Sequence, residues 1–142
     1  MQPRLTIVTL GVSDLDRSKR FYNEVLGWPP FQDTGGIVMY KLNGVLLSLY
    51  PQHELMEDAK AADDARGARS TLAQCLSSPE EVDDLFTHLQ KHGVTITKMP
   101  ERVFWGGYSG YFADPDGHLW EIAHNPFLEL DAVGNVLGVK QG

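Results

Sequence analysis

The stretch YFADPDGHLWEIAHNP, residues 111–126, decides the fold because it encodes a β-hairpin. Asp114, Pro115 and Gly117 occupy the favoured first, second and fourth positions of a type I turn between two apolar strands. Glu121 is a single acidic residue inside the second of these strands. It is therefore either a site residue or a carboxylate that is paired with a cation or an ordered water.

The residues before this hairpin, SSPEEVDDLFTHLQKHG (77–93), predict an amphipathic helix. Ser78 suits the N-cap, Pro79 suits the first helical position, and Gly93 is a natural C-terminal stop. A strand-like segment, STLAQCL (70–76), precedes this helix, and VTITK (94–98) follows it as a second strand-like segment.

The first half of the chain repeats this order. TIVTLGV (6–12) predicts a strand and 13–27 predicts a helix, with Ser13 as its cap. Residues 36–51 predict a hairpin around Asn43-Gly44, which is the strongest short hairpin signal. We infer an internal repeat within one domain: module one is 4–51, a connector or lid is 52–69, module two is 70–126, and the tail is 127–142.

Composition excludes several classes of function. The 142 residues carry a formal charge of -7 and a pI of about 5.1, which argues against nucleic-acid binding. No apolar run is long enough for a membrane span, and the N-terminus does not resemble a signal peptide. Cys75 is the single cysteine, so neither a disulfide nor a cysteine-based zinc site is expected within the chain, and we expect a cytoplasmic location.

The segments GVSDLDRSKRFYNEVLGW (11–28) and GYFADPDGHLWEIAHNP (110–126) together resemble the vicinal oxygen chelate superfamily, which includes glyoxalases, extradiol dioxygenases and bleomycin-resistance proteins. The resemblance covers nearly the whole chain. It implies an α+β fold in which two βαβββ modules enclose a cup that holds a ligand and a metal. It also implies a homodimer.

The resemblance places metal ligands at four positions in this chain: Ile7, Ser48, Thr71 and Glu121. Only Glu121 is a strong ligand. A catalytic divalent ion normally requires three or more histidine or carboxylate ligands. We therefore expect no metal cofactor, although a divalent metal held by a different set of residues stays open as an alternative.

Strand alternation sends Thr9 and Ile7 to the same face as Ser48, and Tyr50 follows two residues after Ser48. The aromatic- and glycine-rich stretch FWGGYSGYF (104–112) supplies Trp105 and Tyr108 as further candidate walls of a binding site. Tyr111 and Phe112, at the end of this stretch, are interpreted as core residues.

These observations predict a protein that binds a small organic molecule in the cup, with Glu121 as the central polar group and a candidate acid or base. Two alternatives stay open. One is a metal-dependent lyase, of the lactoylglutathione lyase type, or a dioxygenase that uses Glu121 with His53. The other is a dimeric interaction module without catalysis.

Overall fold

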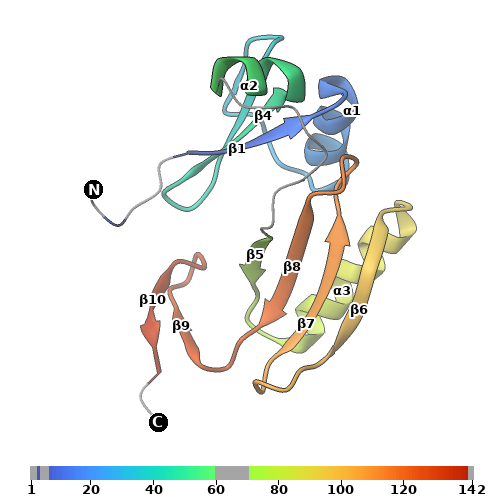
Figure 1. Cartoon of the computed structure of the whole chain (residues 1–142). Coiled ribbons are helices and arrows are strands. Elements are labelled where there is room, and N and C mark those ends of the chain that lie inside the picture. Colours follow the sequence, from blue (N-terminus) through green and yellow to red (C-terminus); the bar gives the residue numbers. More distant parts are fainter. Residues whose placement is uncertain (1–2, 4–6, 60–70, 141–142) are drawn as a thin grey trace. The chain divides into compact units, whose positions relative to one another are not determined.

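The computed structural model describes residue 3, residues 7–59 and residues 71–140. The chain divides into two compact units, Met1–Arg69 and Ser70–Gly142 (Figure 1). We call them module one and module two. The expected connector, 52–69, therefore belongs to module one, and its residues 60–69 lie outside the described part of the chain.

Module one contains one four-stranded sheet and short helical segments. Its elements, in chain order, are β1 (Ile7–Val12), α1 (Leu15–Arg20), the π-helical turn η1 (Phe21–Val25), β2 (Gln32–Asp33), β3 (Val38–Lys41), β4 (Leu46–Pro51) and α2 (Gln52–Ala59). The sheet order is β1-β4-β3-β2, in which β1 runs parallel to β4 and the other pairs are antiparallel. The Asn43-Gly44 signal correctly predicts the β3–β4 hairpin.

The π-helical turn explains how one short helix buries two consecutive aromatic side chains. The wider turn is closed by the Leu26 amide, which donates to the Phe21 carbonyl at 3.1 Å. Phe21 and Tyr22 are both buried, and Tyr22 packs against Tyr40 and Trp28 with ring centroids 5.7 Å away in each case. This aromatic cluster forms the core of module one together with the apolar residues Val12, Val38, Leu47 and Leu49.

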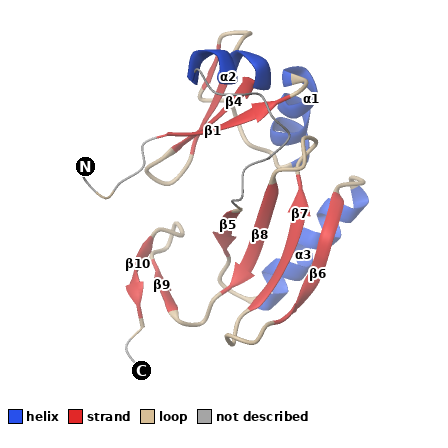
Figure 2. Ribbon diagram, viewed as in Figure 1, coloured by secondary structure: helices blue, strands red, loops and turns tan. Residues whose placement is uncertain are grey.

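Module two repeats the arrangement with a longer helix (Figure 2). Its elements are β5 (Leu72–Cys75), α3 (Pro79–Lys91), β6 (Thr95–Arg102), β7 (Tyr108–Ala113) and β8 (Leu119–His124), and the sheet order is β5-β8-β7-β6. Val82, Phe86 and Leu89 of α3 are buried with residues of β7 and β8, namely Phe112, Trp120 and Ile122. The predicted turn is confirmed by the Gly117 amide, which donates to the Asp114 carbonyl at 2.9 Å.

The two modules agree in register as well as in strand order. In module one, Ser48 lies between Thr9 of β1 and Met39 of β3. In module two, Glu121 lies between Ala73 of β5 and Tyr111 of β7. The prediction of an α+β fold built from two βαβββ modules is confirmed.

One local prediction needs correction. The N-cap of α1 is Asp14 rather than Ser13, because the Asp14 carboxylate accepts from the Arg17 amide at 2.9 Å. Ser13 instead accepts from the Arg17 guanidinium at 2.8 Å. Two further elements complete the described chain. In the tail, β9 (Leu128–Leu130) and β10 (Val136–Val139) pair with each other as a separate hairpin. The start of the connector forms a two-turn helix, α2.

Candidate functional site

Each sheet has one face that packs against α1 or α3, and we call the other face its open face. On β8 the side chains of Trp120 and Ile122 are buried against the α3 side, so alternation places Glu121 on the open face of module two. Glu121 is half-buried there. Glu121 therefore faces away from α3, as strand alternation predicts.

Glu121 has two close neighbours on this face. Tyr111 pairs directly with it across β7 and β8, so the phenol and the carboxylate lie side by side on this face. Burial, followed by the neighbouring Glu121 carboxylate, raises the pKa of the Tyr111 phenol. Cys75 is the second neighbour, and its thiol pKa is raised first by burial and then by the charge of Glu121. The open face of module two therefore presents a carboxylate flanked by a neutral phenol and a neutral thiol.

A cation extends this row toward the sheet edge. Lys98 of β6 pairs with Tyr111, so one row across the sheet contains Lys98, Tyr111, Glu121 and Ala73. The Lys98 ammonium lies 3.1 Å from the carboxylate of Glu101. A ligand that lies across the strands would thus meet three polar groups in this row: the Lys98 ammonium as a donor, the Tyr111 phenol, and the Glu121 carboxylate as an acceptor.

The open face of module one contains four of the predicted residues. Ile7 and Thr9 are exposed on the edge strand β1. Ser48 and Tyr50 are on the neighbouring strand β4, where Ser48 is fully buried and Tyr50 is half-buried. The structure therefore brings Ile7, Thr9, Ser48 and Tyr50 together as predicted, with the hydroxyl groups of the last three on one face.

The other three predicted residues of the site lie elsewhere. Tyr108 is on the α3 side of β7, where its hydroxyl donates to the Asp83 carboxylate at 2.7 Å, so it does not share the open face. Trp105 lies in the β6–β7 loop with its ring folded over Gly107. Thr71 is exposed and directly precedes β5.

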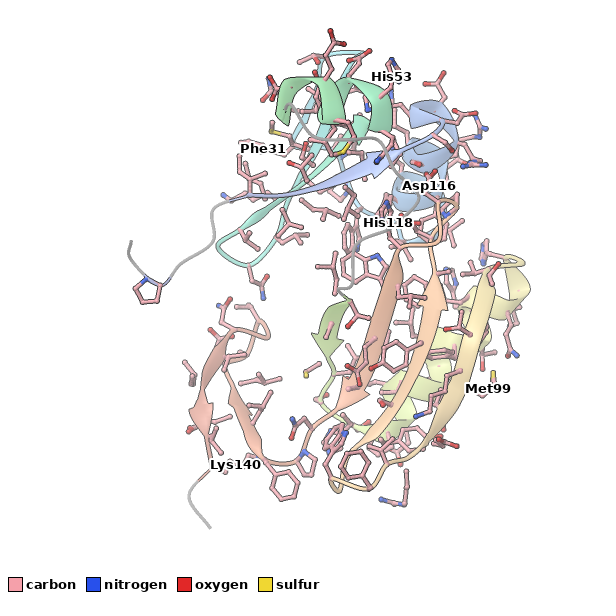
Figure 3. All side chains as sticks on the ribbon, in the orientation of Figure 1. Phe31, His53, Met99, Asp116, His118 and Lys140 are labelled. Atoms are coloured by element: carbon pink, nitrogen blue, oxygen red, sulfur yellow. The ribbon has the colours of Figure 1, made fainter. Side chains whose placement is uncertain are left out.

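The donor set does not fit the divalent metal that the fold implies. Ile7 has no donor atom, and Ser48 and Thr71 offer neutral hydroxyls, which leaves Glu121 as the single strong ligand of the four positions. Within residues 7–59 and 71–140, no group of three or more histidine, cysteine or acidic side chains is arranged to hold a metal ion. His53, the alternative partner, projects from α2 and lies 3.7 Å from Glu54 (Figure 3).

Two residues of the module-two open face were missed by the sequence-based site prediction. Tyr111 was assigned to the core, although counting back from the turn residues Asp114 and Gly117 places it opposite Glu121. Lys98 is placed opposite Tyr111 by irregularities in the β6–β7 register on either side of it, which strict alternation along the sequence does not predict.

Comparison with known proteins agrees with this geometry. Residues 4–122 match the family profile described as the glyoxalase/bleomycin resistance protein/dioxygenase superfamily. The chain belongs to this superfamily. Among solved structures of the superfamily, a glyoxalase-related enzyme from Fulvimarina pelagi is 35% identical and superposes with a TM-score of 0.90, covering 98% of this chain and 100% of that one.

Curated relatives of this superfamily member include transferases. The glutathione transferase FosA of Serratia marcescens is 33% identical over 128 residues, which is 86% of this chain and 81% of that protein. The metallothiol transferase FosB of Shouchella clausii is 30% identical over 118 residues, which is 81% of this chain and 75% of that protein. A lactoylglutathione lyase from Agrobacterium tumefaciens shares the fold, with a TM-score of 0.64, 23% identity, and coverage of 87% of this chain and 95% of that one.

Among the described helices, none combines the length and the hydrophobicity of a membrane span.

The position of Cys75 beside Glu121 predicts a measurable change in thiol reactivity. Glu121→Gln removes the negative charge that helps to raise the Cys75 pKa, so the pH at which alkylation by iodoacetamide reaches half its maximal rate should shift downward. The thiol of the unmodified protein should react slowly at pH 7 because it is protonated. Glu129→Gln, in β9, is the matched control and should leave the profile unchanged. An identical profile in Glu121→Gln and the unmodified protein would show that the carboxylate does not act on Cys75.

Proposed function

We propose that the chain binds small organic molecules on the open faces of its sheets, with Glu121 as the central polar group on the open face of module two. The observation that carries this proposal is the half-buried Glu121 carboxylate, which lies beside the Tyr111 phenol in a row that also contains Lys98 and Ala73. Such a mixture of apolar surface with a few convergent polar groups is typical of small-molecule sites. The relatives named above, whose names denote enzymes that act on thiol-containing compounds, support a small organic ligand.

If the bound molecule contains a carbonyl group, Glu121 acts as a base toward it. The carboxylate takes a proton from the carbon next to the carbonyl, the electron pair of the broken C–H bond moves toward the carbonyl oxygen, and a hydroxyl donor such as Tyr111 stabilises the resulting oxyanion. In the reverse step a proton returns to carbon from the Glu121 carboxyl group, which can first exchange its proton with solvent. The neutral, protonated state of Tyr111 suits this role, because burial and Glu121 both raise its pKa.

A thermal-shift screen of small carbonyl, thiol and amine compounds, followed by titration of the hits, tests this proposal. Glu121→Gln should weaken binding by about 10- to 100-fold, because a hydrogen bond to a charged group contributes about 1.5–3 kcal/mol. Glu129→Gln makes the same carboxyl-to-amide change in β9, outside the sheet that contains Glu121. This variant should bind the hits as tightly as the unmodified protein. For carbonyl hits, NMR in heavy water should show exchange of the adjacent carbon-bound proton, and Glu121→Gln should abolish it. Equal affinity in Glu121→Gln and the unmodified protein would refute the central role of Glu121.

A metal-dependent transferase, lyase or dioxygenase is the second candidate, and the relatives favour it. The metallothiol transferase and the lactoylglutathione lyase are similar to this chain in sequence or fold. This candidate requires near-stoichiometric Fe, Ni, Zn or Mn in protein purified without added metal, together with its loss in Glu121→Ala. Formation of lactoylglutathione or consumption of glutathione by the loaded protein would then identify the reaction.

A homodimer is part of the proposal. The C-terminal hairpin exposes the apolar residues Val133, Val136, Leu137 and Val139, which lie on or between β9 and β10. A contiguous exposed apolar surface is typical of association sites. Light scattering that gives twice the chain mass of 15.8 kDa would support the dimer.

A further inference from the structure

The helix α2 turns back over the open face of module one. Gly11 and Tyr50 are directly paired on β1 and β4, and both face away from α1. A side chain at Gly11 would collide with the carboxamide of Gln52, the first residue of α2. Tyr50 forms a side-chain hydrogen bond with Glu54, two residues further along the same helix. The first turn of α2 is therefore held against this face.

The same face of module one contains a buried hydroxyl group that has no hydrogen-bond partner. Ser48, which precedes Tyr50 by two residues on the same face, is fully buried, and its hydroxyl has no hydrogen-bond partner. Among the buried side-chain polar atoms of the described residues, it is the single atom in this state. A buried hydroxyl without a partner is costly, so a group that supplies one gains free energy when it reaches Ser48.

The contacts that hold α2 are of a kind that a ligand can replace. Tyr50 and Glu54 are both only half-buried. The apolar residues of the helix, Leu55 and Met56, are also only half-buried. The remaining described side chains of its second turn, Glu57 and Asp58, are exposed. A segment with few buried apolar contacts opens locally at low cost.

We propose that α2 is a displaceable cover on the ligand-binding face of module one, and that its opening admits a hydrogen-bonding group of the ligand to Ser48. This inference rests on the proposed function, since it concerns ligand access to the same open faces. The ligand group is a carbonyl or hydroxyl, because either one can pair with the Ser48 hydroxyl.

Cysteine labelling measures this opening without any natural ligand. Ser48→Cys is made in a Cys75→Ala background, so that the introduced thiol is the single one in the chain. Iodoacetamide should label this thiol slowly, at a rate limited by the opening of α2. Adding Tyr50→Phe removes the hydrogen bond to Glu54 and should accelerate labelling by about 5- to 10-fold.

Two controls make the result specific. Ile7 lies on the same face and is 44% exposed. Ile7→Cys should therefore be labelled rapidly, with or without Tyr50→Phe. Tyr108→Phe removes the corresponding phenol–carboxylate hydrogen bond of module two, between Tyr108 and Asp83, and should not change the labelling of Ser48→Cys. Hydrogen exchange of the α2 amides should rise in Tyr50→Phe by the same factor as the labelling rate, while the amides of β1 and β4 stay protected.

The outcomes separate this inference from the proposed function. Labelling of Ser48→Cys as fast as Ile7→Cys would show that α2 does not cover Ser48. Labelling that occurs only at the rate of global unfolding, unchanged by Tyr50→Phe, would show that α2 is a fixed part of module one. Either result would overturn the cover and leave the Glu121 binding test unaffected, whereas a failure of ligand binding in that test would leave these labelling rates as they are.

Discussion

Gly110→Ala should destabilise the protein by about 3 kcal/mol, at the upper end of the usual cost of overpacking a core. Gly110 lies in β7 and faces α3, where an added Cβ would lie 2.7 Å from Cζ of Phe86, 2.8 Å from the Lys98 carbonyl oxygen and 2.9 Å from the Pro100 nitrogen. Two of these three atoms belong to the backbone and cannot rotate away. The strain would therefore move β6 or α3 away from β7.

Equilibrium unfolding in urea measures this loss, and Gly36→Ala is the matched control. Gly36 has no neighbour within 4 Å of an added Cβ and no positive φ, so its replacement should be neutral. Because β6 carries Lys98 opposite Tyr111, a displaced β6 should also weaken ligand binding on the module-two open face. A Gly110→Ala protein as stable as Gly36→Ala would show that the packing of β6, β7 and α3 is looser than the structure describes.

Alkaline pH should remove a stabilising contribution of Tyr40. This residue is 1% exposed, and burial, followed by the charge of Asp33, raises its pKa to about 12. A phenol whose pKa is higher in the folded than in the unfolded protein stabilises the fold fully below its unfolded value, near 10, and loses that contribution as the pH rises toward 12. The change across this interval is about 2 kcal/mol, given about 1.4 kcal/mol for each pKa unit.

Comparison with Tyr40→Phe isolates this contribution from the other groups that titrate at high pH. At pH 8 the variant should be less stable than the unmodified protein by about 1 kcal/mol, because it lacks the hydrogen bond from the Tyr40 hydroxyl to Asn23, which measures 2.7 Å. At pH 11.5 this difference should vanish or change sign. A difference in unfolding free energy that stays constant with pH would contradict the buried, neutral state of the phenol.

Turn chemistry made much of the fold predictable from the sequence. The Asp114–Gly117 turn and the Asn43-Gly44 turn each fix the register of a hairpin, because the side-chain period of a strand is two. Once the register is fixed, the buried residues on either side of Glu121 and Ser48 determine which face each of them occupies. The repeated helix stops at Gly27 and Gly93, both with positive φ, set the spacing of the two modules.

Features that depend on contacts distant in sequence were less predictable. The irregular pairing of β6 with β7 places Lys98 opposite Tyr111. The partner of Tyr108 on the α3 side, Asp83, is 25 residues away in sequence. The cap of α1 depends on which of two adjacent polar residues reaches the Arg17 amide, and both Ser13 and Asp14 satisfy the composition rule. The C-terminal hairpin arises from a tail with weak alternation, which does not distinguish self-pairing from addition to a sheet.

The two modules have the same strand order and register, so the chain contains two copies of one backbone arrangement with different side chains at equivalent positions. Ser48 and Met39 in one copy stand where Glu121 and Tyr111 stand in the other. All four positions lie on the open faces, away from the packing of α1 and α3 against their sheets. The repeat thus keeps the residues that specify folding apart from those that differ between the two halves, so the reactivity of one half can change while both hydrophobic interiors remain as they are.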